Sequence, residues 1–290
     1  MNGFIITTDS GCDLPMSICV ERAIIPLQLK YVIEDKIFTD SMHHENCREF
    51  YDKMRRGAVP KTSQVNVFEF VDFWKTLLPK GLPIVHISLG SGISGTYANG
   101  LLARDILIKE HPDAKIFVVD STLASVGYGM LALKAADMRD QGISPKDCVE
   151  WLEAHKVEIN TYYTTSDLTY LCRSGRVSRV GAMVGTMFKI NPILNLDKEG
   201  HLIVQEKIRG EKATIKRIYA IIKDLAVNPE NQTLYICHSD IIDKAKSFGD
   251  KLCQYLGFRD VYYTYIGPTI GSHSGPGLMA AFFFGKPRTM

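Results

Sequence analysis

Short apolar runs alternate with longer helix-like segments through the first half of the chain. The runs with the length and β-branched content of strands are Phe4–Thr8, Ile24–Tyr31, Ile84–Leu89 and Lys115–Asp120. Helices are predicted at 43–56, 66–78, 96–110 and 122–141, and the last is followed by Gly142, a residue typical of a helix C-terminus. Strands that alternate with helices in this way predict βαβ units and a parallel sheet.

After residue 157 the order changes, because strand-like segments follow one another with fewer helices between them. The predicted strands are Ile159–Thr164, Ile190–Leu196, His201–Ile208, Gln232–His238 and Val261–Ile266. A hairpin turn is expected at Lys198-Glu199-Gly200, and helices are expected at 211–226 and 240–256. We therefore predict an α/β protein of two domains, a parallel-sheet α/β domain at 1–157 and a partly antiparallel α+β domain at 158–290.

Charge and hydropathy narrow the class of protein. The 290-residue chain has 34 basic and 32 acidic side chains. This balance gives no support for nucleic acid or a membrane surface as the main partner, so we expect no nucleic acid and at most transient membrane contact. No apolar run reaches the roughly 18 residues of a spanning helix, and the N-terminal segment has the pattern of a strand and not of a signal peptide. We expect a cytoplasmic protein.

The cysteines and the two N-terminal aspartates, Asp9 and Asp13, favour structural roles over catalytic or metal-binding ones. The seven cysteines contain no C-x-x-C pair, which favours reduced, buried thiols, and we predict neither a metal site nor a cofactor. Cys172, beside Arg173, is a candidate reactive thiol. Asp9 and Asp13 could form an acid pair, but Asp13 before Leu14-Pro15 is more simply a helix N-cap.

The segment 90–96, Gly-Ser-Gly-Ile-Ser-Gly-Thr, has the composition of an anion-binding loop. It follows an apolar strand and leads into a helix, where free amides and hydroxyls point at a ligand. Thr62-Ser63-Gln64 and the segment 271–277, with His273 between two serines, have the same chemistry. We predict that these three segments hold a buried acidic headgroup.

Each segment also has an alternative interpretation. Gly90, Gly92 and Gly95 fit the G-x-G-x-x-G spacing of a dinucleotide site, with Asp120 at the end of the next strand, although the loop does not follow the first strand. Thr62-Ser63-Gln64 could instead begin the helix near Val67. His273 could be a structural histidine, but the glycines around it favour a functional role.

A cluster of arginines offers groups that suit phosphate or carboxylate. Arg173, Arg176 and Arg179 lie within seven residues, and Lys189 follows. Arg209 stands before a glycine turn, where a long cation can reach toward a cleft. A solvated loop explains these residues about as well.

In their order and spacing, eight segments together resemble the DegV family of fatty-acid-binding proteins, which includes the fatty-acid-binding subunit of bacterial fatty acid kinase. They are TDSGCDLP at 8–15, TSQ at 62–64, SGISGTY at 91–97, VVDSTLAS at 118–125, GRVS at 175–178, NPIL at 191–194, IRG at 208–210 and IGPTIGSHSGPG at 266–277. The resemblance covers nearly the whole chain. It implies two domains that enclose one fatty acid.

The resemblance also implies roles for individual residues. The carboxylate would be held by Thr62-Ser63 and Ser94-Gly95, with His273 nearby. The protein would not be an enzyme itself but would present the long-chain fatty acid to a separate ATP-dependent kinase subunit that forms the acyl phosphate used in phospholipid synthesis. Arg173, Arg176 and Arg209 are then expected at the partner contact or beside the transferring phosphoryl group.

Three hypotheses follow from the sequence. The first is a carrier that presents fatty acid to a kinase, the second is an NAD-dependent oxidoreductase that uses the loop at 90–95, and the third is a fatty-acid-binding protein without a kinase partner. A lipid adduct or a nicotinamide adduct in native mass spectrometry separates the first from the second. Only a partner assay separates the first from the third.

Overall fold

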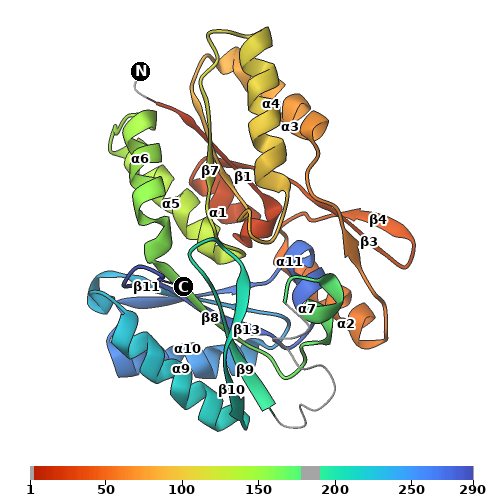
Figure 1. The fold of residues 1–290 in the computed structure, drawn as a ribbon, viewed down its shortest axis with the longest axis vertical. Helices are drawn as coiled ribbons and strands as arrows, with labels where there is room; N and C mark the ends of the chain where they lie inside the picture. The colour runs from red at the N-terminus through yellow and green to blue at the C-terminus, as the bar shows by residue number, and fades with distance from the viewer. Residues whose placement is uncertain (1–2, 178–189, 290) are drawn as a thin grey trace.

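The computed structural model describes residues 3–177 and 190–289. The N-terminal part is built on a four-stranded sheet with the order β2-β1-β6-β7, in which all neighbours are parallel. The strands are β1 (Ile5–Asp9), β2 (Ile24–Leu27), β6 (Ile84–Ser88) and β7 (Ile116–Asp120). The predicted parallel α/β unit is confirmed, because helices on both faces supply the crossovers that parallel strands need (Figure 1).

Alternate side chains of these strands bury opposite faces of the sheet. Ile5 and Ile84 pack with Trp74 under α3 (Val67–Lys75) and α4 (Thr96–Glu110). Ile6 and Val85 face α5 (Val126–Asp140) and α6 (Pro145–His155). A short helix, α1 (Met16–Glu21), contacts β2 at the edge.

An antiparallel ribbon extends from this domain. It consists of β3 (Lys30–Ile33), β4 (Lys36–Thr39) and β5 (Lys61–Thr62), with α2 (Cys47–Arg55) in the connection. The predicted single strand Ile24–Tyr31 is wrong, because β2 ends at Leu27 and β3 belongs to the ribbon. Gln28 is exposed where the chain changes sheets, whereas Leu29 turns inward and is buried.

The C-terminal part contains a six-stranded mixed sheet with the order β10-β9-β8-β13-β11-β12. Only β11 and β12 are parallel among its neighbours. Its strands are β8 (Ile159–Thr164), β9 (Ile190–Leu196), β10 (Leu202–Arg209), β11 (Thr233–His238), β12 (Asp260–Tyr265) and β13 (Met279–Phe284). The predicted partly antiparallel sheet and the hairpin turn before β10 are confirmed, whereas the central strand β13 was not predicted.

The two faces of this sheet have different neighbours. Met279, Ala281 and Phe283 of β13 pack under α9 (Glu211–Leu225) and α10 (Ile242–Leu256). Ala280 and Phe282 lie in the core cluster that also holds α5 and α6 of the N-terminal part. The largest hydrophobic core therefore crosses from one sheet to the other.

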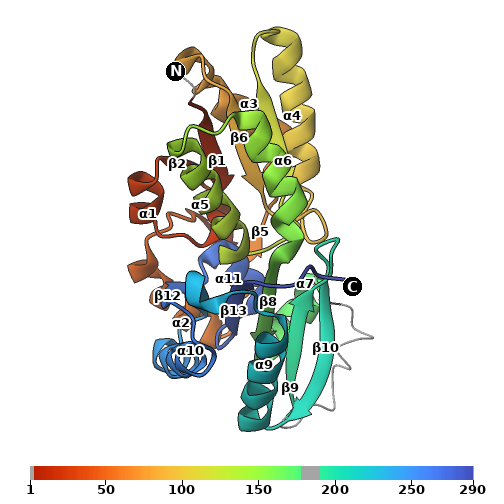
Figure 2. The ribbon, with the colours of Figure 1, turned by 90° about the vertical axis from the view of Figure 1, so that its left-hand side faces the viewer.

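Two short helices fill the boundary between the halves (Figure 2). They are α7 (Thr169–Ser174) and α11 (Pro268–Ser274), and α11 contacts β3, β5 and α2 of the N-terminal half. The predicted boundary after 157 falls in the 3-10 turn Lys156–Glu158 that joins α6 to β8. Among the described residues, none of the helices is both long enough and apolar enough to cross a membrane.

Candidate ligand-binding site

A cavity of about 420 Å³ lies between the two halves, and its volume is typical of small-molecule sites. The N-terminal half contributes β5, the loop after β6 and the loop after β7 to its lining. The C-terminal half contributes β8, β9, α7 and α11. Segments far apart in the sequence thus meet around one cavity.

Partly exposed polar residues and buried apolar residues both contribute to the lining. The polar lining residues that keep partial or full exposure are Thr62, Ser63, Gln64, Ser91, Ser94, Arg176 and His273. The buried apolar lining residues include Leu89, Ala124, Leu171, Leu194, Leu196, Ile266 and Leu278. This arrangement suits an amphipathic ligand with a polar headgroup and a long apolar tail.

Thr62 and His273 meet at the polar end of the cavity. The Thr62 Oγ1 and His273 Nε2 atoms are 2.7 Å apart and join β5 to α11. The prediction that His273 lies in a glycine-rich loop is wrong, because it occupies the last turn of α11. The prediction that it lies near Thr62 is confirmed by this contact.

The His273 imidazole is neutral near physiological pH. Burial, with a smaller contribution from the charge of Arg176, lowers the pKa of His273 to about 4. If Nε2 carries the proton, it donates to Thr62 Oγ1 and leaves the threonine hydroxyl proton for a ligand. The Nδ1 atom is buried and has no hydrogen-bond partner among the described residues.

The loop after β6 brings Ser94 and Gly95 to the same end of the cavity. Ser94 Oγ accepts a hydrogen bond from the Thr96 amide at 3.2 Å and lies 2.9 Å from Thr96 Oγ1. Gly95 is covered by the Gln64 side chain, since a Cβ at this position would lie 2.2 Å from Gln64 Oε1. Ser63 lines the cavity beside them. The structure therefore brings together all five predicted headgroup residues.

The glycines of this loop make close contacts with the protein itself. A Cβ on Gly90 would meet the backbone of Leu123, and a Cβ on Gly92 would meet the backbone of Gly200 at 2.5 Å. Asp120 accepts hydrogen bonds from Ser91 N at 3.0 Å and from Ser91 Oγ at 2.5 Å. A dinucleotide site would need these glycines and this carboxylate for the ligand, so the geometry argues against that alternative.

The base of α11 is held by buried carboxylates. Asp13 accepts from the Gly267 amide at 2.8 Å, and Asp40 accepts from the amide and hydroxyl of Thr269 at 3.1 and 2.5 Å. Burial raises the pKa of both groups above the usual range. The prediction that Asp13 is an N-cap is wrong, because α1 begins after Pro15 without a side-chain cap. Asp13 instead orients the helix that carries His273.

Asp9 is the third buried acid near this point. Its carboxylate accepts from Tyr128 Oη at 2.5 Å and from the Gly11 amide at 3.0 Å, and burial raises its pKa to about 6. The interpretation of Asp9 as structural fits these contacts.

The alternative role of Thr62-Ser63-Gln64 as a helix start is wrong, because Asn66 caps α3 and accepts from the Glu69 amide.

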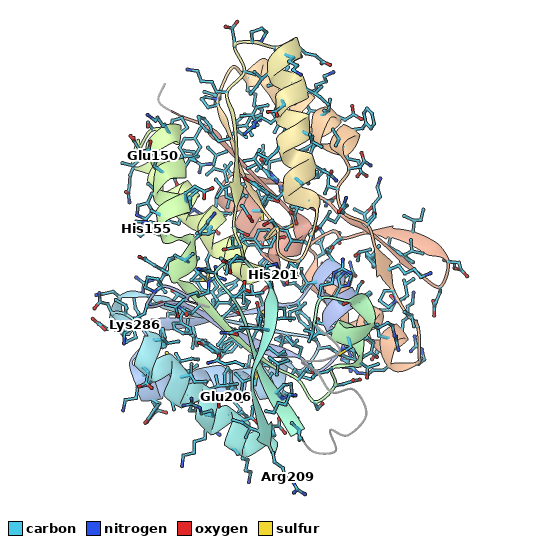
Figure 3. All side chains as sticks on the ribbon, in the orientation of Figure 1. Glu150, His155, His201, Glu206, Arg209 and Lys286 are labelled. Carbon is cyan, nitrogen blue, oxygen red and sulfur yellow. The ribbon has the colours of Figure 1, made fainter. Side chains whose placement is uncertain are left out.

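The predicted arginines occupy different places. Arg176 lines the cavity and donates to the Ser174 carbonyl at 2.6 Å. Arg173 is exposed, with its guanidinium 5.6 Å from the centre of the Tyr170 ring. Arg209 lies at the end of β10 that points away from the domain boundary and does not line the cavity (Figure 3). Arg179 and Lys189 lie outside the described residues.

Tyr163 and Ser125 line the cavity but were not predicted from the sequence, whereas Ser274 lies in the predicted segment 271–277. Tyr163 and Ser274 are buried, and their hydroxyl oxygens have no hydrogen-bond partner among the described residues. Ser125 lines the cavity and donates a short hydrogen bond to Asp13. Tyr163 lies in a predicted strand and faces the cavity by alternation, but the sequence does not show which face of that strand is the lined one.

The fold and the site define a class, a two-domain α/β protein with an amphipathic cavity between its domains. The family model described as "Uncharacterised protein, DegV family" matches residues 4–286. A DegV domain-containing protein of Clostridium perfringens is 36% identical over 289 residues, which cover 99% of each chain. This chain belongs to the DegV family, as the resemblance predicted.

Solved structures with the same fold include proteins described as lipid binders. A DegV lipid-binding protein from Thermotoga maritima has a TM-score of 0.84 at 28% identity and covers 99% of this chain and 100% of its own. A DegV family protein from Thermus thermophilus, described for fatty acid binding, has a TM-score of 0.88 at 26% identity, with 98% and 99% coverage. DegV of Bacillus subtilis, described as a fatty acid binding protein, has a TM-score of 0.85 at 26% identity, with 99% and 100% coverage.

Proposed function

We propose that this protein binds one long-chain fatty acid, with the carboxylate at Thr62, Ser94 and His273 and the acyl chain in the apolar interior. The observation that carries this proposal is the cavity between the two halves, which combines a partly exposed group of hydroxyls and an imidazole with a buried apolar lining. The fatty-acid-binding structures of the DegV proteins from Thermus thermophilus and Bacillus subtilis support it.

The physical chemistry of the site suits such a ligand. Each buried methylene contributes about 0.8 kcal/mol, so roughly fourteen methylenes supply on the order of 11 kcal/mol before ordering and association costs. This contribution has no direction, so the few hydroxyls and the imidazole must fix the orientation of the carboxylate. The hydroxyls and the neutral imidazole at the headgroup can donate hydrogen bonds to an anion, and the Arg176 guanidinium that lines the cavity adds a positive charge.

Extraction of the purified protein with organic solvent, followed by mass spectrometry, tests this proposal. We expect a long-chain fatty acid in the extract, and we expect added palmitate to raise the melting temperature of delipidated protein. A protein that yields no fatty acid in repeated preparations, and whose melting temperature palmitate does not change, would contradict it.

The headgroup assignment makes a separate prediction. Thr62→Val and Ser94→Ala should each weaken palmitate binding about ten-fold or more, since a hydrogen bond to a charged group contributes about 1.5–3 kcal/mol. Isothermal titration of delipidated protein measures the effect. Thr76→Val, in an exposed position on the N-terminal half, is the matched control and should bind as the wild type does. Full affinity in both site variants would place the carboxylate elsewhere.

We further propose that the bound carboxylate is presented to a separate ATP-dependent kinase that forms the acyl phosphate. The headgroup residues lie on the solvent side of the cavity, and Arg173, Arg176 and Arg209 are exposed. Exposed cations suit the docking of an ATP-bearing partner and the charge of a transferring phosphoryl group. The alternative is a fatty-acid-binding protein that acts without a kinase.

Arg209 allows binding and presentation to be separated. Because it lies away from the cavity, Arg209→Ala should retain palmitate affinity yet support roughly ten-fold less acyl phosphate formation with the cognate kinase, the scale of a lost charge-assisted contact. Arg56→Ala, another exposed arginine, serves as the control. Full turnover with Arg209→Ala would remove Arg209 from the presentation surface, and an inactive wild type with every tested kinase would favour the stand-alone binding protein.

A further inference from the structure

Arg288 is a buried arginine on the C-terminal segment, which returns to the boundary between the two halves in both views (Figures 1 and 2). Only 8% of its surface is exposed. One terminal nitrogen donates to the carbonyls of Thr122 at 3.1 Å and Asp197 at 2.6 Å. The other donates to Thr122 Oγ1 at 2.8 Å and, more weakly, to the Lys156 carbonyl at 3.4 Å. These oxygens belong to three separate segments of the chain.

The hydrogen-bond acceptors of Arg288 are three backbone carbonyls and one hydroxyl, not carboxylates. A buried cation is costly unless the surrounding groups replace its hydration. Here the planar guanidinium donates hydrogen bonds to oxygens of both halves of the molecule. A lysine ammonium on its flexible side chain cannot reproduce this arrangement. The guanidinium therefore fixes the relative positions of Thr122 and Asp197.

These positions matter because three loops touch one another beside Arg288. We name the loops 90–95, 121–125 and 197–201 the loop junction. Gly200 lies against Thr122, where an added Cβ would be 3.0 Å from the Thr122 Cα, and Gly92 lies against Gly200. Gly90 donates to the Leu123 carbonyl at 2.8 Å. His201 marks the end of the junction at the domain boundary (Figure 3).

The loop junction forms one wall of the cavity. Its first loop supplies Ser91, Ile93 and Ser94, and its second supplies Ala124 and Ser125. The strands on either side of its third loop supply Leu196 and Leu202. Thr122 has a φ of 52°, and Ser125 has a φ of 55°. Residues other than glycine adopt this conformation only where the surroundings impose it.

We propose that Arg288 is a positioning residue for the ligand cavity, because it fixes the loop junction that forms the cavity wall without touching the ligand. This proposal rests on the proposed fatty-acid function for its binding readout. We therefore expect a substitution of Arg288 to change ligand affinity more than it changes the stability of the fold.

The test compares variants of Arg288 with a variant of equal stability elsewhere. Arg288→Lys keeps the charge and loses the planar fork, so we expect about ten-fold weaker palmitate binding and faster dissociation. Ile222, a buried core residue of α9, does not line the cavity. Ile222→Val and Ile222→Ala should lower the melting temperature and leave palmitate affinity unchanged. The Ile222 variant whose melting temperature is nearest that of Arg288→Lys is the matched control.

A second readout does not depend on the ligand. Amide hydrogen exchange of the delipidated protein should rise in the loop junction of Arg288→Lys and stay unchanged there in the Ile222 control. Thr122→Val removes one acceptor of Arg288 and should give a smaller change in the same direction, so it replaces Arg288→Lys if that variant does not fold.

The two readouts separate the two proposals. Amide exchange in the loop junction of Arg288→Lys that is no faster than in the Ile222 control would overturn the positioning role. Palmitate affinity of Arg288→Lys equal to that of the matched Ile222 variant would overturn it as well. A wild type that binds no palmitate would overturn the fatty-acid function alone, since the exchange pattern of the loop junction still decides the role of Arg288.

Discussion

Replacing Gly275 with alanine is expected to destabilise the protein by about 3 kcal/mol or more, with a loss of palmitate binding. Gly275 ends α11 with φ 73° and ψ 174°, a region that is essentially restricted to glycine and costs other residues about 1–3 kcal/mol. An added Cβ would also lie 2.2 Å from Cδ2 of the Tyr170 ring, and such overpacking costs typically about 1–3 kcal/mol. His273 and Ser274 precede it directly, so the movement that relieves the clash displaces the headgroup site.

Gly277 provides the matched control. It also has a positive φ, of 86°, but an added Cβ there would have nothing within 4 Å. Gly277→Ala should therefore cost only the backbone term, about 1–2 kcal/mol, and should leave palmitate affinity near that of the wild type. Urea denaturation and titration of both variants measure the difference. Equal losses in the two variants would show that the Tyr170 contact has no energetic role.

Ala124→Phe is expected to weaken palmitate binding about a hundred-fold. Ala124 is buried and belongs to the apolar lining of the cavity. A phenyl ring there occupies space that the acyl chain would fill, and the loss of about four buried methylenes corresponds to roughly 3 kcal/mol. Because the cavity has room for the ring, the fold should tolerate it.

A series of shorter acids is the control for this prediction. Octanoate does not need the interior, so its affinity should be nearly equal in Ala124→Phe and the wild type, and the gap should widen with each added methylene. Competition against a fluorescent fatty acid measures the series. An equal loss for octanoate and palmitate would mean that the ring disturbs the headgroup or the fold and does not shorten the tail site.

Several elements have the bounds that their local sequence predicted. The helix at 96–110 and the strands at 159–164 and 190–196 have the predicted bounds. The helix α11 was missed, because contacts with residues far away in the chain determine it. Asp13 bonds to Gly267 across 254 positions, and Asp40 bonds to Thr269 across 229 positions. No local pattern contains this information.

The residues of the site also fall into those that the sequence predicted and those that it did not. Residue types and glycine-rich loops indicated Thr62, Ser94 and His273, although the contact between Thr62 and His273 spans 211 positions. The burial of Arg288 could not be predicted, since a single arginine after a short apolar run has no pattern that indicates it. Its role depends on three loops that meet only in the folded protein. Arg209 was expected to reach the cleft, but the direction of β10 carries it away.

The largest hydrophobic core continues across both halves, and the cavity opens within it. Under the proposed function, a bound acyl chain would be a component of that core, and the free energy of binding would add to the free energy of unfolding, by about 4.1 kcal/mol when the free ligand is at 1,000 times its Kd. Proteases act on opened chains, so occupied molecules should survive longer than empty ones. The lifetime of this protein in the cell would then report the supply of fatty acid, with no dedicated sensor.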